Sequence, residues 1–386
     1  MGPWLLAGVA VSSDARKAHA EIDAATSHNV LYSPFYLHID PMERLLLINF
    51  VKGADEVYAG FEPQVFDDDV HGTGLLVIGW RLDGYVDVYH QPGLKLDPST
   101  YSIAGKGLAD MIERPMRGAR FEVTRAGVDA SISFLDKLNR RVDLQVVERS
   151  ARPRRPFSLL APMGSAADAP NALPLVFLHG FYFVRQADSE IRVEVAGSAR
   201  RISRLPIPLD GSRMYFLRYS DDPLITTWNP ARDGRLRPLD RKGGEAELDG
   251  VTYDLVENDG QLGFRRMRRT YKSHLVAVDF SPPVPNLLHV HPGMHVSGDF
   301  AVTAGDAAGS VTGRYQLERQ GDKAVLQVSP SGGWRPNESK WSLKFMYRLV
   351  PAFTRWPKTY VWTAEVDVSD PKRVTMRSSW RRTEGR

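Results

Sequence analysis

The sequence predicts an all-β protein made of two antiparallel β-barrel or β-sandwich domains, with a short N-terminal helix. After residue 40, short runs of alternating polar and apolar residues are broken by Gly, Pro, Asp and Asn. Turns at such close spacing are typical of antiparallel meanders. Helices long enough to cross over between parallel strands are missing from the pattern, which disfavours α/β folds. The composition, 42% hydrophobic and 25% charged residues in 386, is that of a globular protein.

The expected elements follow along the chain. A helix is expected over 14–29, where Ser13 or Asp14 caps the first turn and Ala18, Ile22 and Ala25 form a thin apolar stripe. Strands of the first half are expected at 44–50, 57–61, 74–80, 85–90, 101–104, 119–125, 128–135 and 141–148, with a short helix at 107–113. Strands of the second half are expected at 175–186, 190–196, 199–205, 213–219, 251–256, 262–269, 273–280, 298–303, 309–318, 324–329, 342–350, 359–368 and 373–381.

A proline-rich stretch at 151–174 predicts the domain boundary. Five prolines fall there among small residues, and proline withholds the N–H that a strand ladder needs. We therefore expect an N-terminal helical segment over 1–30, a first β-barrel domain over 31–160 and a second over 161–386. Residues 220–250 are rich in Asp, Arg, Gly and Pro, and this polar insert is expected to be a long loop or lid.

The charge balance argues against a nucleic-acid partner. Lys and Arg total 50 and Asp and Glu total 46, so the net charge is only +4. The basic run at 265–269 falls on both faces of a strand instead of forming one stripe. The apolar run at 4–11 lacks a preceding positive segment and is too short to span a bilayer. We expect a soluble, cytoplasmic protein without stable membrane insertion, and the oligomeric state stays open.

Several classes of chemistry are excluded. The chain has no cysteine, which removes disulfides, thiolate zinc sites, iron–sulfur clusters and cysteine nucleophiles. It also lacks a G-x-S-x-G elbow, a Walker A loop, a G-x-G-x-x-G after a strand and an H-E-x-x-H motif. His, Asp, Glu and Tyr remain for acid–base or metal chemistry.

Aromatic side chains recur at alternate positions of the expected strands, where they either fill an ordinary barrel core or line a cavity for an apolar ligand. The candidates for ligand binding are Trp80, Tyr85, Phe181, Phe183 and Trp362.

The candidates for acid–base catalysis are Asp87, Tyr89, His90, His179, Tyr182 and Arg185. Strand alternation places Asp87 on the face that carries Tyr85 and Tyr89. If that face points inward, Asp87 is a carboxylate in an apolar lumen with a raised pKa, suited to proton transfer. If it points outward, Asp87 is an ordinary surface residue.

A histidine cluster offers a metal site. His289 and His291 share one face of a strand, and a turn at Pro292-Gly293 would bring His295 beside them. Three neutral imidazoles suit Zn or Fe, and the spacing is similar to the H-x-H-x3-E of cupins with His295 in place of the acid. The preceding SPPVPN instead favours a loop with hydrogen-bonding histidines. Without this site no cofactor is required.

A second acidic group, Asp67, Asp68 and Asp69 with His71, predicts either a hard-cation site or a solvated turn. Asp67 and Asp69 would share a strand face with His71.

Four segments carry a resemblance at the level of architecture. They are Gly-Thr-Gly-Leu-Leu-Val-Ile-Gly-Trp at 72–80, Gly-Arg-Tyr-Gln-Leu-Glu at 313–318, Lys-Ala-Val-Leu-Gln-Val at 323–328 and Tyr-Val-Trp-Thr-Ala-Glu at 360–365. With the two β-rich halves, they resemble the two-domain lipocalin-like (calycin) family related to carotenoid hydratases. The resemblance implies a cavity for a hydrophobic small molecule, such as an isoprenoid or polyketide, and a lyase or isomerase that hydrates, isomerises or cyclises it. No motif matches residue by residue, so no catalytic residue is transferred.

Three functions stay open on these grounds. The first is binding of a hydrophobic small molecule in a β-barrel cavity, with or without acid–base transformation. The second is a metal-dependent enzyme or binder that uses His289, His291 and His295. The third is a non-catalytic interaction module that uses the 220–250 segment as its contact surface.

Overall fold

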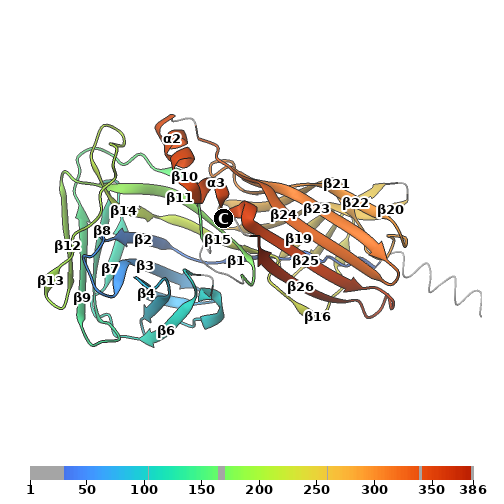
Figure 1. Cartoon of the computed structure of the whole chain (residues 1–386), viewed down its shortest axis with the longest axis horizontal. Helices are drawn as coiled ribbons and strands as arrows, with labels where there is room; N and C mark the ends of the chain where they lie inside the picture. The colour runs from blue at the N-terminus through green and yellow to red at the C-terminus, as the bar shows by residue number, and fades with distance from the viewer. Residues whose placement is uncertain (1–29, 103, 164–169, 259, 339–340, 384–386) are drawn as a thin grey trace, which may run out of the picture.

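The structure is all-β, as predicted. It is a computed structural model that describes residues 30–102, 104–163, 170–258, 260–338 and 341–383. Over these residues the strands form three sheets, and helices are short. Figure 1 shows two β-rich units along the long axis, the first two sheets at one end and the third sheet at the other. The helix expected over 14–29 lies outside the described residues.

The first two sheets make up one unit. Within the described residues, the first sheet has ten strands in the order β1-β15-β11-β14-β2-β3-β4-β5-β6, with β10 paired to β11. Its strands are β1 (Leu37–Asp40), β2 (Arg44–Asn49), β3 (Tyr58–Asp68), β4 (Gly72–Arg81), β5 (Val86–His90), β6 (Leu108–Glu113), β10 (Phe157–Ala161), β11 (Leu173–Arg185), β14 (Met214–Ser220) and β15 (Asp222–Trp228). The second sheet has the order β13-β12-β9-β8-β7 and consists of β7 (Arg120–Val123), β8 (Val128–Leu135), β9 (Arg141–Glu148), β12 (Ser189–Val195) and β13 (Ser198–Ala199).

These two sheets draw on chain from both sides of the proline-rich stretch at 151–174. β12 pairs with β9, and β14 pairs with β2. The unit is therefore assembled from segments on either side of the boundary that we placed from composition.

The third sheet forms the other unit. In the described residues it has eleven strands in the order β16-β26-β25-β24-β23-β22-β21-β20-β19-β18-β17. They are β16 (Asp233–Arg235), β17 (Asp240–Lys242), β18 (Glu245–Leu248), β19 (Val251–Asn258), β20 (Gln261–Tyr271), β21 (His274–Pro285), β22 (His295–Ala304), β23 (Ser310–Gln320), β24 (Lys323–Arg335), β25 (Tyr360–Asp367) and β26 (Thr375–Arg382). The helical segments are η1 (Pro98–Tyr101), α2 (Trp341–Leu349), α3 (Pro351–Arg355) and η2 (Pro357–Thr359).

The second sheet packs against one face of the first. β8 buries every second residue, the pattern of a strand with one face on a core and one toward water. Its Phe134 ring lies 4.9 Å from the ring of Tyr89 and 6.0 Å from that of Phe61, measured between centroids. Aromatic side chains therefore fill the space between the two sheets at this point, and the cavity described below lies on the opposite face of the first sheet.

The third sheet curls around a core that is filled with side chains. Phe35, from the segment before β1, stacks 5.0 Å from Phe280 and lies 5.6 Å from Trp362. Trp228 at the end of β15 lies 4.7 Å from Phe300. All five side chains belong to one buried cluster. Side chains of the first unit therefore fill part of the core of the third sheet.

Three strands of the first sheet form a wall that both units share. In β1, β15 and β11, the residues that belong to the core of the third sheet are Leu37, Ile39, Leu224, Trp228, Leu173, Leu175 and Phe177. The residues between them line a cavity on the other side: His38, Asp40, Ile225, Thr227, Pro174 and Val176. Because both of its faces are covered, β11 is apolar almost throughout, as a strand buried on both faces must be.

A glycine forms the corner of this wall. Before Gly180, β11 pairs with β15; after it, β11 pairs with β14. Gly180 has φ +56°, and a Cβ at this position would collide with the carboxylate of Asp221 at the matching corner between β14 and β15. Asp221 in turn pairs with Arg154, which also donates to the Gly180 carbonyl at 3.0 Å. Only glycine fits this bend without strain.

Several expected elements differ from the structure. Residues 107–113, expected to be helical, form β6, which pairs in parallel with β5; the long connection after β5 gives the chain room to return. At 101–104, where a strand was expected, Tyr101 is the last residue of the 3₁₀ turn η1 and Ser102 is its C-cap. The polar segment 220–250, expected to be a loop or lid, contains β15 through β18, and β15 is a central, buried strand.

Residues 342–350 form most of the helix α2 instead of the expected strand. Apolar residues at 341, 343, 345, 347 and 349 alternate as in a strand. In a short segment that alternation also fits a helix, because every fourth residue falls on one helical face.

Candidate functional site

The candidate site is a cavity of ≈ 260 Å³ on the face of the first sheet that lies opposite the second sheet, at the wall shared with the third sheet. We call it the junction cavity. Its lining comes from the wall strands, from β3 and β4, and from the η1 segment: Tyr36, His38, Asp40, Met42, Gln64, Phe66, Ile78, Ser99, Thr100, Tyr101, Ala104, Met163, Asn171, Ala172, Pro174, Val176, Ile225, Thr227 and Pro230. Most of the exposed surface of the wall is apolar. Such a cavity with a few polar groups is typical of small-molecule sites.

A carboxylate–imidazole–carboxylate chain leads away from the cavity wall. Asp40 lines the cavity and accepts from His71 Nε2 at 3.0 Å, while His71 Nδ1 contacts Asp68 at 3.1 Å. Burial lowers the pKa of His71, but the hydrogen bonds and charges of Asp40 and Asp68 outweigh it, so the pKa is raised overall. His71, which does not line the cavity, therefore holds the Asp40 carboxylate in place. Sequence alternation grouped His71 with Asp67 and Asp69, whereas the structure pairs it with Asp68 and Asp40.

His38 lines the same cavity, two residues before Asp40 on β1. Burial lowers the pKa of its imidazole, the charge of Asp40 partly opposes this, and Arg269 and His71 lower it further. The His38 imidazole is therefore neutral at pH 7, since the ordinary histidine pKa already lies below that pH. A neutral imidazole on the wall can accept a proton or a hydrogen bond from a ligand.

A buried carboxyl group, that of Glu62, contacts the lining residue Gln64 without lining the cavity itself. Glu62 is 1% exposed; its Oε1 accepts from Gln64 Nε2 at 2.8 Å and its Oε2 from Trp80 Nε1 at 2.9 Å. Burial raises the pKa of Glu62 to about 7, although both hydrogen bonds and the charge of Arg218 lower it. Glu62 and Gln64 lie two residues apart on β3 and therefore share a face, and Gln64 reaches the cavity wall.

Tyr101 lies close enough to Asp40 and Glu62 for the charge of each to act on its hydroxyl. Its side chain lines the cavity, and burial raises the pKa of its hydroxyl, with the charges of Asp40 and Glu62 adding to the shift. Tyr101 therefore stays protonated and can donate or accept a hydrogen bond. The junction cavity thus combines a neutral imidazole, an anchored carboxylate, an amide and a phenol on a largely apolar wall.

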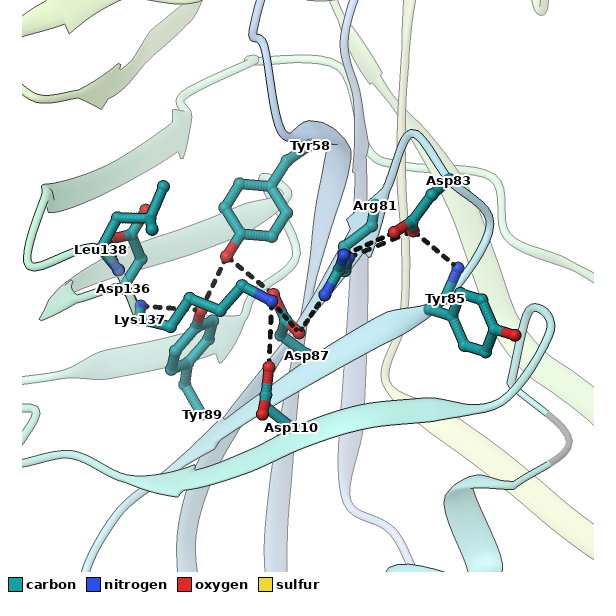
Figure 2. Close-up of polar contacts among 10 residues, drawn as sticks. All are labelled: Tyr58, Arg81, Asp83, Tyr85, Asp87, Tyr89, Asp110, Asp136, Lys137 and Leu138. Carbon is teal, nitrogen blue, oxygen red and sulfur yellow. Dashed lines mark hydrogen bonds and ion pairs between the residues drawn. The ribbon is translucent and has the colours of Figure 1, made fainter.

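The predicted catalytic carboxylate, Asp87, lies elsewhere (Figure 2). It is fully buried on the face of the first sheet that packs against the second sheet. Its oxygens accept from Tyr58 at 3.0 Å, Lys137 at 3.0 Å and Arg81 at 3.3 Å. Tyr89 shares this cluster, with its hydroxyl 2.7 Å from that of Tyr58. The face does point inward, yet Asp87 meets cations and a phenol between two sheets instead of an apolar lumen.

Tyr182 and Arg185 form a separate buried cluster. The guanidinium of Arg185 lies 5.3 Å from the ring centroid of Tyr182 and donates to Glu148 at 3.4 Å and to two backbone carbonyls. The Tyr182 hydroxyl donates to Asp210 at 2.9 Å. These contacts satisfy the side chains within the protein, as buried polar groups require.

The remaining predicted catalytic residues are two histidines. His179 stacks on His274 with ring centroids 4.1 Å apart, and its Nδ1 lies 3.0 Å from Ser158 Oγ. Burial, together with the charge of His274, lowers the pKa of His179 to about 4, so His179 is neutral near pH 7. His90, at the end of β5, has its Nδ1 3.1 Å from the carbonyl of Gln91.

The predicted ligand-binding residues are also dispersed. Trp80 holds Glu62, Tyr85 is 44% exposed and precedes β5, and Trp362 is fully buried in the core of the third sheet. Phe181 and Phe183 pack against each other, 5.4 Å between centroids, in the core of the first unit. All eleven predicted catalytic and ligand-binding residues lie in the described part of the chain, and none lines the junction cavity.

The predicted metal site does not form in the described structure. His289 is half-buried, and His291 and His295 are exposed, with the first two in the loop before β22 and His295 at its first residue. Among the described residues, no group of three or more His, Asp or Glu side chains is placed to hold a metal ion. The strand that would have aligned His289 and His291 ends at Pro285, so they lack the shared face that the prediction required.

Sequence reasoning missed His38, Asp40, Glu62 and Gln64. The signal was present: each pair stands two apart in a strand, with apolar neighbours between or around. The expected strand at 57–61 ended one residue before Glu62, whereas β3 continues to Asp68.

No protein-family model, curated protein or solved structure matches the chain. The fold and the site therefore define it by class alone. It is an all-β protein of two sheet units, with a partly apolar cavity at the wall that they share.

Proposed function

We propose that the protein binds a small, mainly apolar molecule with an uncharged polar end in the junction cavity. The observation that supports the proposal is the lining of the cavity: apolar side chains from four strands surround a smaller number of polar groups, among them His38, Asp40, Gln64 and Tyr101. A few polar groups on a largely apolar wall orient a ligand.

The size of the cavity supports a compact ligand. Its ≈ 260 Å³ lies just below the range of about 300–1,000 Å³ that is usual for ligand pockets. A bicyclic ring or a short chain fits this volume better than the long isoprenoid that the family resemblance implies. The lipocalin-like relationship and the isoprenoid or polyketide class stay expectations that a bound ligand would test.

The charge of the wall supports a hydroxyl or similar donor. Asp40 offers a carboxylate that is already held by His71 at 3.0 Å, and His38 offers a neutral ring. A ligand hydroxyl can donate to either group, while a ligand carboxylate would lie beside Asp40 and be repelled. If the ligand is transformed, His38 is our choice for the proton acceptor, because its imidazole lines the cavity and is neutral.

Binding of 2-naphthol and of 2-naphthoate at pH 7.5, followed by fluorescence, tests the proposal. We expect 2-naphthol to bind and 2-naphthoate to bind at least about tenfold more weakly, the cost of roughly 1.4 kcal/mol of repulsion. Ile225→Trp fills the cavity and should abolish 2-naphthol binding. Leu275→Trp is the matched control, because Leu275 is 41% exposed and lies outside the cavity lining. Equal binding by the two variants, or no binding by the native protein, would refute the proposal.

A further inference from the structure

The helix α2 exposes two large aromatic side chains. Trp341 is 78% exposed and Phe345 is 47% exposed, whereas Leu343 and Tyr347 are 1% and 4% exposed. At about 100° per residue, residues four apart share a helical face, so Trp341 and Phe345 point away from the side that Leu343 and Tyr347 bury. Figure 1 shows α2 at the edge of the molecule, standing out from the sheets. The exposed pair therefore forms an apolar ridge that the fold leaves uncovered.

The ridge is held firmly. The ring of Tyr347 lies 4.8 Å from that of Trp334 on β24 and 5.3 Å from that of Phe353 on α3, and Trp334 and Phe353 lie 5.5 Å apart. This aromatic triangle fixes one face of α2 to the third sheet. The orientation of Trp341 and Phe345 toward solvent is therefore a property of the packed fold.

The charged residues of α2, α3 and η2 are all basic, whereas Glu338 lies just before α2 and its charge acts on Tyr347. Lys344 and Arg348 follow Phe345 and Tyr347 on α2, and Arg355 and Lys358 follow on α3 and η2. All four side chains are exposed, and within the described part of the chain none forms an ion pair. No Asp or Glu occurs from 341 to 364. Elsewhere on the surface, basic side chains commonly pair with carboxylates, as Lys323 does with Glu365 at 2.6 Å.

We propose that α2 docks the protein on the surface of an anionic lipid bilayer, with Trp341 and Phe345 entering the headgroup region. An aromatic pair beside unpaired basic residues is the composition of helices that lie in the interface. Tryptophan favours that region because its ring is apolar and its N–H finds a partner there. Two rings alone bind weakly, so the basic residues supply the second signal that stable docking needs.

This docking is peripheral. Among the described residues, no helix has the length and apolar composition to cross a membrane. α2 has nine residues, about 14 Å at 1.5 Å per residue, against a hydrocarbon core of about 30 Å. The helical segment also touches the junction cavity, since Trp356 Nε1 donates to the carbonyl of Met163, a lining residue. The docking inference holds whether or not the cavity binds a ligand.

Sedimentation of the full chain with vesicles tests the proposal. Vesicles of phosphatidylcholine with about 30% phosphatidylserine should bind the protein, and pure phosphatidylcholine vesicles should bind it far less. Lys344→Gln with Arg348→Gln should weaken binding to the anionic vesicles about 25-fold, at about fivefold per basic residue. The matched control is Lys52→Gln with Arg117→Gln, which removes two exposed basic residues elsewhere and should leave binding unchanged.

The aromatic ridge has its own test. Trp341→Ser with Phe345→Ser should abolish sedimentation with anionic vesicles, and Leu138→Ser, which removes a side chain 56% exposed on another surface, should not. Thermal unfolding should be the same for these variants, because none of the side chains is buried. Equal binding to both kinds of vesicle, or native binding by the double serine variant, would overturn the proposal. So would self-association in analytical ultracentrifugation that Trp341→Ser abolishes, because the ridge would then bind a second copy of the chain.

Discussion

Replacing Glu62 by glutamine should remove a pH-dependent loss of stability from the first sheet. Glu62 is buried and holds Gln64 and Trp80 by hydrogen bonds of 2.8 and 2.9 Å. A glutamine at 62 can keep both bonds: its carbonyl accepts from Trp80, and its amide donates to Gln64 once the Gln64 amide rotates. The substitution therefore removes the titration of the group with little change in shape.

The sign of the effect follows from the raised pKa. Burial raises the pKa of Glu62 from 4.5 to about 7 in the folded chain. Between these values the folded state holds a proton that the unfolded state has released, so the free energy of unfolding falls as the pH rises. At about 1.4 kcal/mol per pKa unit, the full loss is about 3 kcal/mol, and roughly 2–3 kcal/mol of it falls between pH 5 and pH 8.

Urea unfolding of the native chain and of Glu62→Gln at pH 5 and pH 8 measures this difference directly. We expect the free energy of unfolding of the variant, relative to that of the native chain, to be roughly 2–3 kcal/mol higher at pH 8 than at pH 5. Glu122→Gln is the matched control, since Glu122 is exposed on β7 and outside the ion pairs of the described residues. A stability difference between Glu62→Gln and the native chain that is the same at both pH values would refute the reasoning, because Glu62 would then be ionised or solvated in the folded state.

Other predictions concern the corner, the buried ion pairs and the histidine. Gly180→Ala should lower the free energy of unfolding in urea by about 2–3 kcal/mol, because φ is +56° and the new Cβ meets the Asp221 carboxylate. The control Gly197→Ala, with φ +73° and open space around the Cβ, should lower it by only about 1 kcal/mol. Asp87→Ala should cost about 2 kcal/mol, because it removes the fully buried carboxylate that Arg81, Lys137 and Tyr58 share and leaves the two cations only their exposed partners. Asp110→Ala removes an exposed partner and should cost under about 1 kcal/mol. The raised pKa of His71 means that its pairing stabilises the fold below its unfolded pKa of about 6.5 and is lost as the pH rises through the folded value. The stability advantage of the native chain over His71→Gln should therefore shrink from about pH 6 to pH 8.5 in the same assay.

The local pattern of the sequence was sufficient for many strands. The runs expected at 128–135 and 141–148 coincide with β8 and β9, because β8 and the first six residues of β9 alternate between a covered and a more exposed face. Alternation also placed Asp87 and Tyr89 on one face of the strand but left its direction open; the structure turns that face inward, where both residues meet Tyr58. Alternation could not show that a second sheet fills the space opposite that face, since the partner sheet is built from residues far along the chain.

The candidate site could not be predicted in the same way. The lining of the junction cavity comes from residues near 40, 65, 100, 170 and 225, which only the order of the first sheet brings together. β11 is apolar on both faces, so its sequence does not show which face is core and which lines a cavity. In α2 the alternation of apolar residues fits a strand as well as a helix. Only the helix leaves Trp341 and Phe345 exposed.

The shared wall makes the two units dependent on each other. In β1, in β15 and in the first part of β11, apolar side chains on one face belong to the core of the third sheet, and side chains on the other face line the junction cavity. Trp228 is fully buried against Phe300, while Thr227, its neighbour, faces the cavity. If the first sheet unfolds, the third sheet loses side chains that fill part of its core. The two units should therefore unfold in one transition, and a ligand that fills the cavity should raise the stability of both, because it binds only when the wall is formed.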